Sequence, residues 1–128
     1  MIDYTFDYRK PSVQIIGKWQ PWHEGHTQLF KKALTFTGQV VIMVREVYGS
    51  EEDAPFGEIS VIDTIHKALE AEGFYDGQHY VIICTPNIIG MCTGPGNDIR
   101  IDRYDCGEYD EAIRSSDIRQ QLREEGKL

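Results

Sequence analysis

Three short apolar runs, spaced along the chain with helix-like segments between them, constrain the fold of this protein more than any other feature. The runs cover residues 13–16, 39–45 and 80–84. The second and third are nearly continuous and rich in β-branched residues, which is typical of strands with both faces covered. Parallel strands need a long crossover between them, and the two intervals are long enough for a helix each.

The intervals show helical spacing. The first carries apolar residues at 29, 30, 33 and 34, and the second predicts a helix over residues 58–73 that ends at Gly73. One face of that second helix is expected to be buried, and its members are Ile59, Ile62, Ile65, His66 and Leu69. Residues 99–104 alternate and predict a fourth strand, and Ser115 or Ser116 is expected to cap a final helix reaching about residue 125. The pattern indicates an α/β fold: a Rossmann-like open, mostly parallel sheet with helices on both faces, forming one domain over residues 1–128.

Charge and hydropathy exclude several classes of function. The formal net charge of −8 argues against general nucleic-acid binding, which needs basic side chains to replace counterions. No apolar run approaches the roughly 20 residues that span a bilayer, so no membrane partner is expected. The first residues lack the pattern of a signal peptide, which favours a cytoplasmic location. The three cysteines, Cys84, Cys92 and Cys106, contain no CxxC pair and predict neither a disulfide framework nor a zinc site.

The segment directly after the first predicted strand contains most of the candidate functional residues. Residues 17–26 read GKWQPWHEGH and precede the first predicted helix. This arrangement aims the N–H groups of a helix N-terminus at whatever lies beyond the strand end. His23 and His26 lie three residues apart, and Gly25 between them lets a ligand approach closely. We expect this turn to hold phosphate groups.

Residues 17–26 resemble the first motif of the HxGH nucleotidylyltransferase superfamily, in the form found in enzymes of the nicotinamide mononucleotide adenylyltransferase type. Residues 113–119, IRSSDIR, are similar to the second motif of that superfamily and fall where it is expected, at the start of the last helix. Residues 53–56 resemble, more weakly, the Asn-Pro-Phe stretch before the second helix of those enzymes. The resemblance spans nearly the whole chain.

The resemblance implies transfer of a nucleoside monophosphate from a nucleoside triphosphate to a small phosphorylated acceptor, with release of pyrophosphate. The residue types of the first motif favour ATP and an acceptor like nicotinamide mononucleotide. The short chain favours instead a cytidylyltransferase that uses CTP and a phospho-polyol or phosphonate. Two departures bear on this choice: Lys18 stands where the adenylyltransferases have arginine, and Gln20 where the cytidylyltransferases have aspartate. A regulator that binds nucleotides without turnover is the alternative outside the enzymes.

The resemblance also implies roles for individual residues. His23, His26, Lys18 and Arg119 are expected to contact the triphosphate and act in catalysis. The residues expected to bind the nucleotide are Gly17, Trp19, Gln20, Gly25, Ser115, Ser116 and Ile118. Those expected to bind the acceptor are Trp22, Arg45, Phe56 and Asn87. A Mg²⁺ ion is expected to be held mainly by the phosphates, with no metal site made by the protein alone.

Plainer interpretations remain open at several of these positions. Trp19 and Trp22 are either core residues or a wall for a base or ring. A serine pair such as Ser115 and Ser116 is commonly just a helix cap. The glycine-rich residues 90–97 lack the Gly-Lys-Ser/Thr of a P-loop and predict a loop. Symmetric assembly is common among small enzymes of this kind, so a homo-oligomer is expected.

Overall fold

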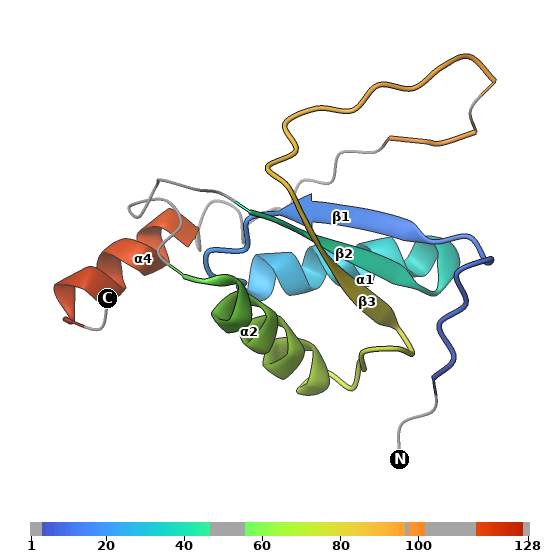
Figure 1. The fold of residues 1–128 in the computed structure, drawn as a ribbon. Helices are drawn as coiled ribbons and strands as arrows, with labels where there is room; N and C mark the ends of the chain where they lie inside the picture. Colours follow the sequence, from blue (N-terminus) through green and yellow to red (C-terminus); the bar gives the residue numbers. More distant parts are fainter. Residues whose placement is uncertain (1–3, 47–55, 97, 102–114, 127–128) are drawn as a thin grey trace.

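The core of the protein is an open parallel sheet of three strands with helices packed against it (Figure 1). The computed structural model describes residues 4–46, 56–96, 98–101 and 115–126. The elements follow in the order β1 (Val13–Gly17), α1 (Glu24–Thr37), β2 (Val40–Arg45), α2 (Glu58–Glu70), β3 (Tyr80–Thr85) and α4 (Ser115–Glu124). Strand, helix and strand alternate along the first two-thirds of the chain, as the spacing of apolar residues predicts.

The strands lie in the order β1-β2-β3, and both neighbouring pairs are parallel. Ile15, Ile42 and Ile82 share one row of the register and point to the same face of the sheet. Ile15 and Ile42 are buried in the hydrophobic core, and Ile82 packs against it. The three strands therefore present one continuous apolar face.

Both α1 and α2 cover that same face. The Tyr80 ring on β3 contacts Phe30 of α1, with ring centroids 5.8 Å apart, and its hydroxyl lies 2.6 Å from Nδ1 of His66 on α2. Right-handed crossovers that step in one direction along a sheet place their helices on one side of it. The predicted open parallel sheet with alternating helices is therefore confirmed, with α1 and α2 packed on one of its faces. On the second face, Ile16 and Ile83 are 40% and 39% exposed.

The buried face of α2 differs from the prediction. Val61, Ile65 and Leu69 are buried, and Ile59 is 85% exposed. These three residues are spaced by four and form one stripe along the helix, whereas Ile59 lies in the first turn, off that stripe. His66 is half-buried against Tyr80, which confirms its assignment to the core side. The helix ends at Glu70, and Gly73 follows with a left-handed φ of 85°.

The predicted strand at residues 99–104 is not formed by the residues that can be described. Residues 99–101 have no regular secondary structure, and residues 102–104 lie outside the described ranges. Ile99 and Ile101 are 61% and 69% exposed, and between them the Arg100 guanidinium lies 4.9 Å from the centre of the Phe36 ring. Within residues 98–101 the alternation thus places the Arg100 guanidinium on an aromatic ring of α1.

No helix within the described ranges has both the length and the apolar composition needed to cross a membrane.

Candidate functional site

The turn after β1 is built around Trp19, which has a left-handed backbone with φ of 55°. This conformation is unfavourable for a bulky residue and persists only where the surroundings enforce it. The indole Nε1 donates to the Met43 carbonyl at 3.0 Å, and the ring lies on Gly17. A Cβ at position 17 would stand 3.1 Å from three atoms of that ring. A side chain at position 17 would therefore require the indole, which packs directly on the Gly17 backbone, to shift.

The two histidines form a reciprocal cap at the start of α1. Nδ1 of His23 accepts from the Gly25 N–H at 3.0 Å, and Nδ1 of His26 accepts from the His23 N–H at 3.1 Å. The rings are stacked with centroids 3.8 Å apart. Because each Nδ1 accepts a backbone hydrogen bond, the proton of each neutral ring must reside on Nε2. The cap thus fixes both imidazoles as Nε2–H donors.

This cap changes the expected role of the helix N-terminus. The His26 N–H donates to the His23 carbonyl at 2.9 Å, so the N–H groups of His23, Gly25 and His26 are all used inside the turn. The expectation that free backbone N–H groups face the ligand is therefore wrong for these three residues. His26, which lines the pocket described below, still carries a donor at Nε2.

Burial keeps His26 neutral. Desolvation, and after it the nearby His23 ring, lowers the pKa of His26 to about 3. The Trp19 and His26 rings meet edge to face with centroids 4.8 Å apart, and Trp22 lies 5.5 Å away. A neutral imidazole held in one tautomer donates a hydrogen bond of constant strength across physiological pH.

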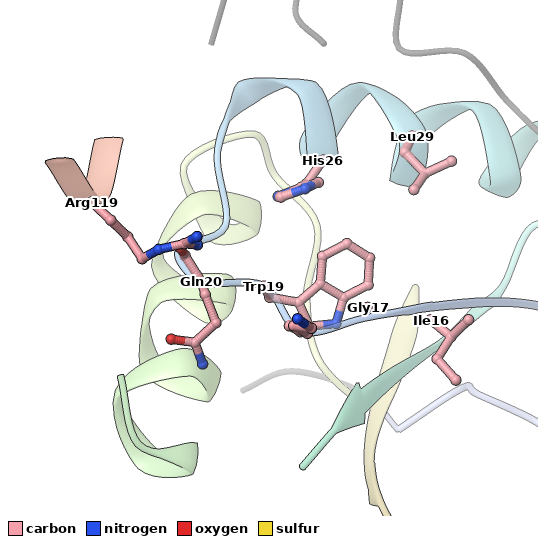
Figure 2. Close-up of a pocket in the computed structure, with 8 residues that line it drawn as sticks. Ile16, Gly17, Trp19, Gln20, His26, Leu29 and Arg119 are labelled. Carbon is pink, nitrogen blue, oxygen red and sulfur yellow. The ribbon is translucent and has the colours of Figure 1, made fainter. Parts of the chain in front are cut away.

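A pocket of about 510 Å³ opens where β1 ends (Figure 2). Arg119 reaches it from α4 and His26 from α1. It is lined by Ile16, Gly17, Lys18, Trp19, Gln20, His26, Leu29 and Arg119. Two segments 99 residues apart in the sequence are joined here, because Nη1 of Arg119 donates to the Gln20 carbonyl at 2.7 Å. The pocket brings together six of the residues that the sequence predicts for the site.

Arg119 is almost fully buried, with 9% of its surface exposed. Its guanidinium therefore brings a buried positive charge to the pocket. Lys18 is the second cation of the pocket lining. No carboxylate is among the described residues that line the pocket, so it suits an anion.

Gln20 and Phe56 are joined by two hydrogen bonds. The Gln20 side-chain amide donates to the Phe56 carbonyl at 2.9 Å and accepts from the Phe56 N–H at 2.8 Å. The sequence gives no signal for this pair, because its members are 36 residues apart and the contact uses backbone atoms of Phe56. Both polar ends of the Gln20 amide are thereby occupied.

The remaining predicted residues, His23 among them, do not belong to the described residues that line the pocket. Trp22 is buried, with Nε1 donating to Thr27 Oγ1 at 2.9 Å, and supports His26 from the core side. Arg45 and Asn87, at the ends of β2 and β3, are joined by a hydrogen bond of 2.9 Å. Gly25 is buried in the first turn of α1.

On α4, Ile118 is half-buried next to Arg119. Ser115 and Ser116 begin the helix, and their side chains lie outside the described part of the structure. Ile16 and Leu29 line the pocket although the sequence predicts them only as strand and helix residues. Their apolar side chains gave no hint of a role beyond packing.

Metal-binding residues do not cluster in the described ranges, where no three His, Cys, Asp or Glu side chains lie close enough to hold an ion. No model of a known protein family matches the chain, and no curated protein matches it closely enough to count as a relative. The geometry of the pocket is therefore the basis for any assignment of function.

Proposed function

We propose that this protein is a nucleotidylyltransferase, which transfers a nucleoside monophosphate from a nucleoside triphosphate to a small phosphorylated acceptor. The observation that carries the proposal is the convergence of His26 and Arg119, from opposite ends of the chain, on one pocket at the carboxyl end of β1. Ligands of open α/β sheets bind at this edge. The two motif resemblances in the sequence predict the same meeting point.

The reaction asks for alignment and charge stabilisation more than for proton transfer. An anionic oxygen of the acceptor phosphate attacks the α-phosphorus, a new P–O bond forms, and the bond to pyrophosphate breaks. The Nε2–H groups of His23 and His26 donate to the phosphate oxygens, and the neutral His26 does so without a change of protonation. Lys18 and Arg119 offset the negative charge on the triphosphate and on the departing pyrophosphate.

Mg²⁺ fits this pocket as a companion of the nucleotide. Its preferred ligands are oxygens in octahedral geometry, and the described lining residues offer no carboxylate. The phosphates would hold the ion, and the ion would neutralise part of their charge. Lys18 and Arg119 supply the remaining positive charge from the protein.

The acceptor is assigned to the neighbouring strand ends. Arg45 is held by Asn87 at the ends of β2 and β3, on the same edge of the sheet as the pocket. A guanidinium in that position suits an anionic group of the acceptor. Because of the residue types in the first motif, we favour ATP with an acceptor like nicotinamide mononucleotide. The competing pair is CTP with a phospho-polyol or phosphonate.

The proposal is tested by measuring pyrophosphate release with Mg²⁺, each nucleoside triphosphate and a panel of phosphorylated acceptors. Release with ATP or with CTP, dependent on one acceptor, is the expected result and identifies the base. Binding of nucleotide without release for any pair would contradict the enzyme and favour a regulator.

Arg119→Ala tests the placement of the triphosphate. We expect it to weaken binding of the triphosphate more than of the monophosphate, since the guanidinium is assigned to the pyrophosphate end. Arg123→Ala, one turn further along α4 and exposed, is the matched control and should leave both affinities unchanged. Equal losses for both nucleotides in the Arg119 variant would contradict the assignment.

A further inference from the structure

Among the described residues that line the pocket, Gln20 has both polar atoms of its side chain paired with the backbone of another segment. The residue is 7% exposed, and its amide makes the two hydrogen bonds to Phe56 described above. Figure 2 shows this amide directed away from His26 and toward α2. The side chain therefore serves the segment that leads into α2 rather than the base of a nucleotide.

The backbone of the same residue serves a second segment. Its carbonyl accepts the 2.7 Å hydrogen bond from Nη1 of Arg119, in a buried position. From the turn after β1, Gln20 thus contacts two other segments: Phe56, which precedes α2, and helix α4. A movement of Phe56 that pulls on the amide also displaces the carbonyl that holds the guanidinium, because both belong to one tightly packed residue.

We propose that Gln20 is a positioning residue that couples the place of Phe56 to the place of Arg119. The inference rests on the proposed function in one respect, because there Phe56 belongs to the acceptor side and Arg119 to the triphosphate. In that setting the acceptor and the triphosphate each alter the affinity for the other by the same factor, as linkage requires. Gln20 is the link between the two substrates.

Glutamine suits this role because its amide is both donor and acceptor, and this gives a direct test. In Gln20→Glu an ionised carboxylate still accepts from the Phe56 N–H but cannot donate to the Phe56 carbonyl. When protonated, the same carboxyl makes both hydrogen bonds. Burial next to a carbonyl raises its pKa above the ordinary value of about 4.3, and the Arg119 guanidinium, bound to the backbone of the same residue, opposes part of that rise. Lowering the pH should therefore restore both hydrogen bonds to Phe56 in the variant.

The experiment follows backbone amide resonances of the whole ¹⁵N-labelled chain from about pH 8 to about pH 5.5. In Gln20→Glu we expect the Phe56 amide and the amides of α4 to shift together, with one midpoint, toward their wild-type positions at low pH. Gln14→Glu, which places the same charge on an exposed position of β1, is the control and should leave both sets at their wild-type positions. Movement of Phe56 without α4, or of neither, would overturn the coupling.

A second measurement ties the coupling to the ligand. The affinity for inorganic pyrophosphate should fall about 5-fold or more in Gln20→Glu at pH 8 and recover, relative to wild type, at pH 5.5. Gln20→Met makes neither hydrogen bond and carries no charge, so it provides a second test if Gln20→Glu fails to fold. The amide resonances of α4 in Gln20→Met should be shifted from their wild-type positions at every pH. Unchanged α4 amides in Gln20→Met would also overturn the proposal.

The two proposals fail in different ways. If the wild-type protein binds neither pyrophosphate nor a triphosphate, the nucleotidylyltransferase proposal falls, and the amide titration still decides whether Phe56 and Arg119 are coupled. If pyrophosphate binds and the titration shows no common midpoint, the coupling falls and the proposed function stands.

Discussion

Replacing His26 with asparagine or with glutamine separates the two tasks that this one side chain performs. Asparagine places its amide oxygen near the position of Nδ1, so His26→Asn can still accept from the His23 N–H but has no donor at the position of Nε2. Glutamine places its amide nitrogen near Nε2, so His26→Gln keeps the donor and loses the cap. Both variants lose the ring contacts with His23 and Trp19, so that loss cancels in the comparison.

The magnitudes differ enough to be told apart. Loss of a cap hydrogen bond costs about 1 kcal/mol, which lowers the Tm of a domain of this size by roughly 4 °C. Loss of one donor to a phosphoryl oxygen costs about 3 kcal/mol in the transition state, or roughly 100-fold in turnover. We expect His26→Asn to be the more stable and the less active variant, and His26→Gln to be less stable and more active.

The assay pairs thermal unfolding with single-turnover pyrophosphate release for both variants and the wild type. His79→Gln is a useful control, because Nδ1 of His79 also accepts a backbone hydrogen bond, from Tyr75 at 3.0 Å, but lies outside the pocket. It should lose stability and keep turnover. Equal turnover in the two His26 variants, or the reverse order, would refute the division of roles between Nδ1 and Nε2.

Three further predictions follow from the fold. The pKa of His26 is lowered to about 3, so as the pH falls the unfolded chain takes up a proton at this residue before the folded protein does. The free energy of unfolding should therefore fall between about pH 6 and pH 4, by at most about 1.4 kcal/mol per pH unit. Urea unfolding at several pH values should show a smaller dependence of this free energy on pH in His26→Asn than in the wild type. Gly17→Ala should lower the free energy of unfolding by about 1–3 kcal/mol through its clash with the indole, whereas Gly90→Ala, with open space around the new Cβ, should change it by less than about 0.5 kcal/mol; thermal denaturation compares the two. Ile65→Ala should lower the free energy of unfolding by about 2–5 kcal/mol, and Ile59→Ala by less than about 0.5 kcal/mol, as measured by chemical denaturation. Similar losses in the two variants would contradict the buried stripe of α2.

Local patterns predicted the strand-turn-helix unit correctly because its signals lie within a few residues of one another. The apolar run before Gly17 and the helical spacing after His26 specify β1 and α1 with boundaries within a residue or two. The convergence of residues 17–26 with Arg119 was also predictable, since the second motif resemblance named the distant partner. The use of the N–H groups of His23, Gly25 and His26 inside the turn was not predicted, because the capping role of the two imidazoles depends on their side-chain conformations.

Features that depend on distant packing could not be predicted. Ile59 fits the period of an amphipathic helix, and only the placement of α2 on the sheet decides that Val61 is buried in its stead. The face on which each helix packs depends on the direction in which successive strands are added, which no local pattern encodes. The pairing of Gln20 with backbone atoms of Phe56 leaves no trace in the identity of residue 56.

The chain contains two tryptophans, and Trp19 and Trp22 both lie at the turn that ends β1, with indole rings 4.9 Å apart and His26 beside them. Intrinsic fluorescence excited near 295 nm therefore comes from this turn and from nowhere else in the polypeptide. Any ligand that moves the imidazole of His26 alters the quenching of its two neighbours, so unlabelled protein carries its own optical reporter of pocket occupancy.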